Sequence, residues 1–199
     1  MLEEWQSDGE NLRQLALANK EKQVVLGSLL GNASIIKPKK SRNPHFQMRE
    51  SISKGGNWIR CKAHELVKFS RSKSFVQDRD SYRWNSISNQ CWKNYHDLCY
   101  RGSKKFVSMQ WLDQLQDYGL ACWFLDKGEI RDRSLYIRIS RFDKKSVENM
   151  VKYFEIIGIP VEVKKFGGSK ILHFNQDSKV KFLKLVSHRF PLYYIQQIS

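Results

Sequence analysis

The spacing of apolar positions changes in a regular order along this chain of 199 residues, and the same order occurs twice. Residues 22–31 form an apolar run of helical length. The chain then alternates, with Phe46 and Met48 on one face and Gln47 and Arg49 on the other, which is typical of a half-buried strand. The rest of this half is predicted to contain, in order, a helix at residues 58–69, strands at 74–77 and 82–88, and a helix at 92–100.

The second half repeats this order more compactly. Gly158 and Pro160 end its middle helix, and Gly167 and Gly168 supply the positive φ angles of a hairpin turn. The predicted elements are a helix at 119–127, a strand at 134–140, a helix at 142–157, hairpin strands at 161–164 and 170–174, and a helix at 177–187. The duplicated order predicts an α+β fold of two pseudo-symmetric αββαββα halves.

The domain organisation follows from the same pattern. Residues 1–20 are predicted to be an N-terminal extension of polar, helical character. The first half then spans residues 21–100 and the second half spans 119–199. Residues 101–118, which are rich in Lys, Ser and Gln, would connect them.

Composition narrows the choice of partner. The chain is 41% hydrophobic and 13% aromatic, which favours a folded globule, and it carries a net charge of +15. Such an excess of positive charge is typical of a protein that binds a polyanion, nucleic acid first and an anionic membrane second, although a basic solubility shell would look the same. The longest apolar stretch, residues 24–30, is far shorter than the roughly 20 residues of a spanning helix, so no membrane partner is expected.

The four cysteines stand at positions 61, 91, 99 and 122, and none forms a Cys-x-x-Cys pair. Zinc ligation would require a tighter spacing than this. The sequence therefore predicts free thiols, no metal, and an intracellular, reducing compartment: a bacterial or phage-infected cytoplasm, or an organelle matrix.

Two stretches look like one motif written twice. The first, residues 24–33, reads VVLGSLLGNA, and the second, residues 119–128, reads GLACWFLDKG. Gly27 and Gly31 are four residues apart and share one helix face, so that another backbone can approach closely, with Ala121 as the small residue expected at the corresponding level. Each run ends in a polar residue beside a glycine.

Both stretches resemble the signature helices of LAGLIDADG homing endonucleases, and the repeated helix and strand order supports the likeness. The resemblance is to single-chain members with two motifs. It implies that the two signature helices lie at the interface between the halves, and that antiparallel sheets form a saddle along a duplex.

The resemblance also implies where the chemistry of the family would lie. The polar residue at each helix end would be an Asp or Glu that holds a catalytic divalent metal, and these positions fall on Asn32 and Lys127. A basic residue near the site falls on Lys104 or Lys105 in the first half, and on Gln196 or Gln197 in the second. A neutral amide is a weak ligand and an ammonium group repels a divalent cation, so the sequence predicts no bound metal and a degenerate active site.

Two nearby carboxylates could be displaced catalytic acids. Asp126 precedes the predicted position by one residue, about 100° around the helix, and is expected to serve in capping or in the helix interface. Glu129 follows Gly128 and would reach the site only if the backbone bulged. Mg²⁺ would be a cofactor only in this case.

The family resemblance also implies a surface that binds nucleic acid. Outward strand positions are candidates for base or backbone contact, and the basic loop after the first signature helix is a candidate for phosphate contact, with a solvated charge run as the alternative. The candidates are Gln47, Arg49, Tyr136, Arg138, Lys164 and His173 on strands, and Lys37, Lys39, Lys40 and Arg42 in the loop.

Three functions are compatible with these features. The first, which the sequence favours, is a monomeric nucleic-acid-binding protein that has lost metal-dependent phosphodiester cleavage. It would bind double-stranded DNA, or structured RNA as a maturase or a ribonucleoprotein component. The second is an active site-specific DNA endonuclease that uses displaced acids. The third is a structural protein whose basic surface contacts other proteins. The sequence does not choose between DNA and RNA.

Overall fold

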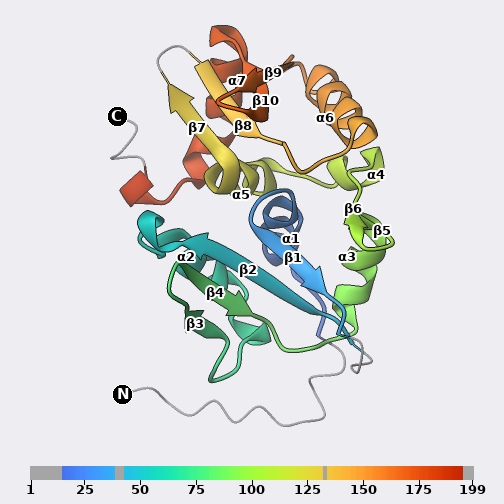
Figure 1. Ribbon diagram of the computed structural model, residues 1–199, viewed down its shortest axis with the longest axis vertical. Helices are drawn as coiled ribbons and strands as arrows, with labels where there is room; N and C mark the ends of the chain where they lie inside the picture. The colour runs from blue at the N-terminus through green and yellow to red at the C-terminus, as the bar shows by residue number, and fades with distance from the viewer. Residues whose placement is uncertain (1–14, 39–42, 132–133, 195–199) are drawn as a thin grey trace.

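The computed structural model describes residues 15–38, 43–131 and 134–194, and it has two halves of similar construction (Figure 1). The first half contains, in order, α1 (Asn19–Leu30), β1 (Ala33–Ile36), β2 (His45–Ser51), α2 (Asn57–Glu65), β3 (Phe75–Gln77), β4 (Ser81–Asn85) and α3 (Cys91–Cys99). The second half contains α5 (Asp117–Lys127), β7 (Gly128–Arg131), β8 (Ser134–Arg138), α6 (Lys144–Ile156), β9 (Glu162–Phe166), β10 (Ser169–Phe174) and α7 (Gln176–Val186). The α+β fold with two αββαββα halves is thus confirmed.

Each half builds one antiparallel sheet of four strands. The strand order is β1-β2-β4-β3 in the first sheet and β7-β8-β10-β9 in the second, so corresponding strands take corresponding places. In β2, Phe46 and Met48 are buried, whereas Gln47 and Arg49 lie on the opposite face. The alternation predicted from the sequence therefore sets which face of the sheet is free.

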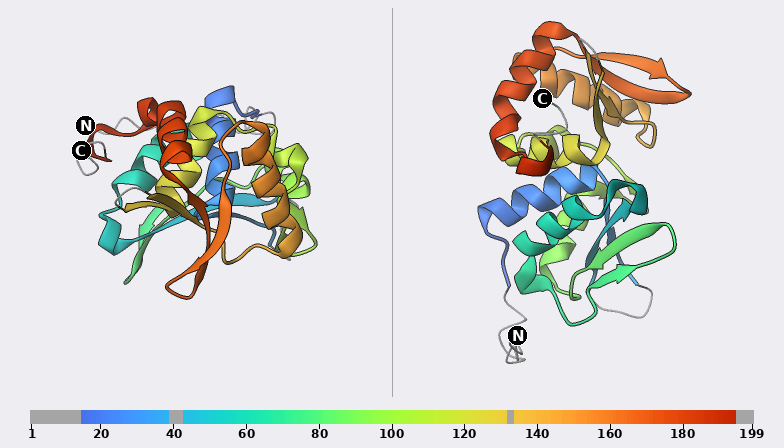
Figure 2. Two further views of the ribbon diagram at one scale, coloured as in Figure 1. Left: turned by 90° about the horizontal axis from the view of Figure 1, so that it is seen from above. Right: turned by 90° about the vertical axis from the view of Figure 1, so that its left-hand side faces the viewer.

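α1 and α5 lie side by side between the two sheets (Figure 2). They approach so closely that a Cβ added at Gly27 would overlap the carbonyl oxygen of Gly119. The close approach at Gly27 was predicted, but the partner was not: Gly119, rather than Ala121, is the small residue opposite Gly27. A glycine on each helix allows the two backbones to meet directly.

Gln23 fixes the other end of this interface. Its side chain is buried, donates to the carbonyl oxygen of Gln114 at 2.9 Å and accepts from the backbone N–H of Gln116 at 2.7 Å. Because the NH2 group and the oxygen of the side-chain amide both have partners in the loop before α5, this polar residue is retained in the buried part of α1.

Several elements differ from the sequence prediction. β1 and β7, the four-residue strands that follow α1 and α5, were not located in the sequence. Residues 15–18 are not helical, so the helical lead-in is wrong there, and residues 1–14 lie outside the described part. The predicted connection contains a small hairpin, β5 (Tyr100–Arg101) and β6 (Lys104–Lys105), and the short helix α4 (Met109–Leu112).

Side-chain caps mark where the outer helices of the second half begin. Asp143 accepts from the backbone N–H of Ser146 at 2.7 Å before α6, and Asn175 accepts from that of Ser178 at 2.9 Å before α7. Such caps satisfy N–H groups that have no partner within the helix. α6 has 13 residues, and across the described ranges no helix combines the length and apolarity needed to cross a membrane.

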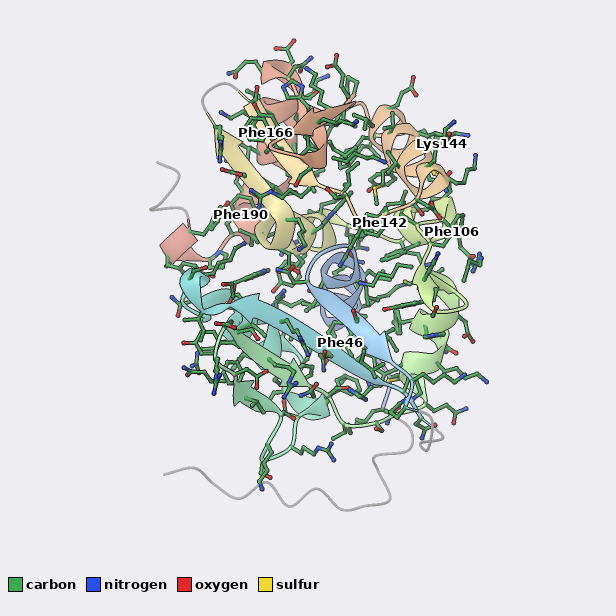
Figure 3. All side chains as sticks on the ribbon, in the orientation of Figure 1. Phe46, Phe106, Phe142, Lys144, Phe166 and Phe190 are labelled. Atoms are coloured by element: carbon green, nitrogen blue, oxygen red, sulfur yellow. The ribbon has the colours of Figure 1, made fainter. Side chains whose placement is uncertain are left out.

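Aromatic side chains fill the space between sheet and helices in each half. In the first half, Phe46 lies on β2 (Figure 3). Its ring stacks on Trp92 of α3 with ring centroids 5.4 Å apart. In the second half, Phe154 of α6 packs edge-on against Phe174 of β10 at 5.1 Å. The buried side chains of both halves and of the paired helices form one continuous core, which holds the sheets against α1 and α5.

Candidate nucleic-acid interface and helix-end site

The C-terminal ends of α1 and α5 meet through Asn32 and Asp126. The Asp126 Oδ2 atom accepts from the backbone N–H of Asn32 at 2.8 Å, and the Asn32 side-chain amide donates to the Asp126 carbonyl oxygen at 3.3 Å. Gly31 makes room for this contact, because a Cβ there would overlap the Asp126 carboxylate. The junction is therefore built around the acid that the sequence placed one residue before the predicted ligand position.

Asp126 is buried, and both of its carboxylate oxygens already accept hydrogen bonds. Its Oδ1 atom accepts from the Lys62 ammonium at 2.6 Å and from the Trp58 indole N–H at 2.9 Å. The Lys62 and Asp126 side chains are each only 1% exposed. A carboxylate that is paired, hydrogen-bonded on both oxygens and closed to water is a structural ion pair rather than an open metal ligand.

The two positions that the family resemblance assigned to catalytic acids are both half-buried. Asn32 already donates its amide to the Asp126 carbonyl, as described above. The side chain of Lys127 makes no hydrogen bond or ion pair within the described part of the chain. Burial lowers the pKa of Lys127, as does the nearby Arg141, so its positive charge stands in an unfavourable place.

Further cations reach the same helix end. The Lys105 ammonium donates to the carbonyl oxygens of Leu29, at 2.8 Å, and Ala33. Arg141 donates to the carbonyl oxygens of Leu29 at 2.9 Å and Leu30 at 2.7 Å. Cations are favourable at a helix C-terminus, where carbonyl groups lack partners. The first of the two predicted basic positions, Lys105, thus lies at the helix end, whereas Gln196 and Gln197 lie outside the described residues.

Three cations at this site were not predicted from the sequence: Lys54, Lys62 and Arg141. The Lys54 ammonium donates to the Asp126 carbonyl oxygen at 3.5 Å. One signal was available for Lys62. It stands four residues after Trp58, on the buried face of an amphipathic helix, and a lysine there requires a buried acidic partner. No comparable signal marks Lys54, the last residue of a single 3-10 turn, or Arg141, which lies in a turn after β8.

The other carboxylates near the helix ends are also engaged. Glu129 pairs with Arg138, at 3.1 Å, and with Arg131, on the outer side of β7. Glu50 is buried and accepts from the backbone N–H of Ile59 at 3.2 Å, and burial raises its pKa. Over residues 15–38, 43–131 and 134–194, no three His, Cys, Asp or Glu side chains are grouped so that they could hold a metal ion.

The outward face of the first sheet is polar. Gln47 is opposite Asn85 and donates to its side-chain oxygen at 2.7 Å, and Arg49 is opposite Arg83 in the register of β2 and β4. Amide and guanidinium groups of this kind can read base edges. The predicted residues Gln47 and Arg49 thus share one face, and Lys37 is exposed near the end of β1. Lys39, Lys40 and Arg42 lie outside the described residues.

The outward face of the second sheet mixes charges and rings. Tyr136 is paired with His173 in the register of β8 and β10, and their ring centroids are 5.4 Å apart. Lys164 contacts both His173, at 3.1 Å, and Glu162, at 2.8 Å. Burial lowers the pKa of His173, as does the positive charge of Lys164. Four predicted strand residues, Tyr136, Arg138, Lys164 and His173, therefore lie on one face.

Phe166 is a further member of this face that the sequence did not single out. It stands beside the hairpin turn at Gly167 and Gly168, whose φ angles of 52° and 76° confirm the predicted positive values. Its ring stacks on Tyr136 with centroids 5.4 Å apart and an interplanar angle of 10°, and the Arg131 guanidinium lies 5.1 Å from its centre. The end of the hairpin thus adds an exposed aromatic side chain to this face of the sheet.

Comparison with known proteins agrees with this architecture. The model of the LAGLIDADG DNA endonuclease family matches residues 22–182. Among solved structures, the homing endonuclease I-WcaI bound to its DNA recognition sequence is similar with a TM-score of 0.80 and 16% identity, over 92% of this chain and 88% of that one. I-DmoI in complex with DNA and Mn gives a TM-score of 0.57 and 13% identity, over 84% and 96%. The N-terminal LAGLIDADG domain of DUF199/WhiA gives 0.51 and 10%, over 94% and 90%.

No curated protein matches the chain. The paired helices, the two antiparallel sheets and the structural likenesses define a protein with the fold of a two-motif homing endonuclease. The match to most of its length shows that the chain belongs to the LAGLIDADG DNA endonuclease family.

Proposed function

We propose that this protein binds nucleic acid through the outward faces of its two sheets and has lost metal-dependent phosphodiester cleavage. One observation carries the proposal. Where the two helix ends meet, the nearby side chains include Asn32, Lys105 and Arg141, and the Asp126 carboxylate is fully occupied by hydrogen bonds from Lys62 and Trp58.

Electrostatics supports the loss of cleavage. A divalent cation binds protein oxygens that bring negative charge, and it activates water only once it is bound. Here an incoming ion would meet ammonium and guanidinium groups, and the Asp126 oxygens could reach it only if the buried ion pair with Lys62 opened. Opening that pair would leave the Lys62 charge buried without a partner, which costs several kcal/mol.

Charge and side-chain chemistry support nucleic acid as the partner. The net charge of +15 is the sign required to neutralise phosphates. The two outward faces present Arg49, Arg83 and Gln47 on one sheet and Arg138 and Tyr136 on the other, groups suited to backbone and base-edge contact. I-WcaI and I-DmoI are both described in complex with DNA, which favours double-stranded DNA over structured RNA.

The oligomeric state and compartment belong to the same proposal. Both signature helices are supplied by one chain, so the interface between halves is complete in a monomer. All four cysteines are free thiols, which favours a reducing, intracellular compartment.

The direct test incubates the purified protein with a randomised library of DNA duplexes in Mg²⁺ or Mn²⁺. Bound duplexes are recovered by mobility shift, and cut ends are sequenced. We expect retained duplexes and no cut ends above a no-protein control. Cut ends that disappear in Asp126→Asn or Glu129→Gln would instead establish an active endonuclease with displaced acids.

A further inference from the structure

A small pocket lies in the first half, where α3 packs beside β1 (Figure 1). Its volume is about 100 Å³, which is room for several water molecules and therefore for one tetrahedral oxyanion. None of its lining residues is acidic and three of them are basic: Lys37, Pro44, Lys93 and His96. The fold thus gathers basic side chains from two separate segments around one space.

This pocket is on the opposite side of the sheet from the outward face. Ile35 and Phe46 are opposite each other in the register of β1 and β2, and both are buried on the side where Trp92 of α3 stacks. Lys37 comes two residues after Ile35, so strand alternation places it on that same side. Gln47, by contrast, belongs to the outward face. We therefore do not expect a duplex on the outward faces to reach the pocket.

His96 is held in place by its neighbours. Its ring stacks on Tyr100 with centroids 4.7 Å apart and an interplanar angle of 2°, and the Tyr100 hydroxyl accepts from the backbone N–H of Ile35 at 3.0 Å. The His96 Nδ1 atom lies 3.3 Å from the Asp97 carboxylate and donates in this contact, because an ionised carboxylate only accepts. Nε2 has no partner among the described residues, so the protonated ring offers this second N–H to an anion.

The two lysines of the pocket also have donors to spare. Neither the Lys37 nor the Lys93 ammonium makes a hydrogen bond or an ion pair with residues 15–38, 43–131 or 134–194. Lys93 and His96 are three residues apart on α3 and so share one helix face. Positive groups around so small a space repel one another, and an anion between them relieves this repulsion and accepts hydrogen bonds from each.

We propose that Lys37, Lys93 and His96 form a phosphate-binding pocket on the helix side of the first sheet, separate from the surface that binds the duplex. The inference goes beyond the proposed function and does not depend on it. Free phosphate and a backbone phosphate of a single-stranded nucleic acid share the chemistry that such a pocket recognises, and the experiment separates these two sources.

The first measurement is a calorimetric titration in metal-free buffer of low ionic strength. The ligands are inorganic phosphate and, separately, a short single-stranded RNA without terminal phosphates. Wild-type protein is compared with Lys37→Met, Lys93→Met, His96→Gln and Lys184→Met. Lys184 is the matched control, because it is an exposed lysine on α7, in the other half, and its side chain has no hydrogen bond or ion pair with any described residue. Thermal melting shows that each variant is folded.

We expect saturable binding by the wild type and by Lys184→Met, and about tenfold or more weaker binding by each pocket variant, the effect of one lost charge-assisted hydrogen bond. If inorganic phosphate binds in this way, free phosphate is a ligand of the pocket. If only the RNA does, the ligand is a backbone phosphate. The pocket is overturned if neither ligand depends on the three pocket residues, or if Lys184→Met weakens binding equally, since the effect is then one of total charge.

The second measurement repeats the titration with protein that is already saturated with a duplex recovered from the binding selection. We expect the affinity of the pocket for its ligand to be unchanged. Loss of ligand binding in the complex would place the pocket within the duplex interface and overturn its separate role. The proposed function, in contrast, fails only if the protein cleaves DNA or does not bind nucleic acid, and the first measurement stands in either case.

Discussion

Asp126 does two things at the junction of the helices: it closes the end of α1 through the backbone of Asn32, and it neutralises the buried ammonium of Lys62. Removing its charge would leave Lys62 uncompensated in a place that is 1% exposed. We expect Asp126→Asn to lower the free energy of unfolding by about 3–5 kcal/mol, measured by urea denaturation.

Glu148→Gln is the control for this substitution, because Glu148 makes an exposed pair with Lys145 at 3.4 Å. Its cost should lie within about 1 kcal/mol. Equal free energies of unfolding for the two variants would show that the ion pair of Asp126 with Lys62 does not stabilise the fold.

Lys127 gives a prediction about pH. Its pKa is lowered in the folded protein by burial and by Arg141, Lys54 and Arg138, against the opposing effect of Asp126, whereas the unfolded value is 10.5. Between the lowered value and 10.5 the unfolded state binds more protons at this position, so the contribution of Lys127 to stability rises with pH.

The measurement is urea denaturation of wild type and Lys127→Met at several pH values from 7 to about 10. The free energy of unfolding of the wild type should rise relative to that of the variant as pH increases. Groups that titrate in both proteins cancel in this difference. A constant or falling difference would contradict the account of Lys127 as a charge held in an unfavourable place.

At the scale of elements, the contact between α1 and α5 depends on glycine. Gly27→Leu would force a side chain into the backbone of Gly119, and we expect a cost of about 1–3 kcal/mol or more in thermal or urea unfolding. Val180→Leu is the control, because Val180 is 55% exposed on α7. If both variants melt like the parent, the helices do not meet where the structure places them.

The sequence predicted the elements with a clear period or turn signal well. Length alone did not decide, since the three-residue strand β3 was predicted whereas β1 and β7 were not. α1, α5, β2, β8 and the β9–β10 hairpin carry strong periodicity or turn glycines. β1 and β7 are four residues long and follow directly on helices, and the partner of Gly27 depends on helix rotation, which spacing alone does not determine. The division into residues 1–20, 21–100, 101–118 and 119–199 stays a prediction.

The helix-end site shows the same limit. Asn32, Lys127 and Lys105 could be named because a family motif points to them. Lys54 and Arg141 meet them only through folding, and for Lys62 the helix pattern indicates burial but not that Asp126 is its partner.

For the whole molecule, the net charge of +15 and the two polar sheet faces make a prediction about nucleic-acid binding. With roughly 6–10 phosphate contacts, affinity should fall about 10³–10⁵-fold between 50 and 200 mM salt. Arg138→Ala should change sequence preference if Arg138 reads bases, whereas loss of a phosphate contact weakens binding to all sequences alike. A flat salt response in a mobility-shift or fluorescence titration would remove the electrostatic basis of the proposal.

The central claim is that the helix ends cannot hold a catalytic divalent metal, and Mn²⁺ binding measured by electron paramagnetic resonance tests it without knowledge of the target sequence. We expect the wild type to leave Mn²⁺ free in solution, and the double variant Asn32→Asp with Lys127→Asp, which restores two carboxylates at the helix ends, to bind it. Tight Mn²⁺ binding by the wild type that is lost in Asp126→Asn or Glu129→Gln would contradict the claim.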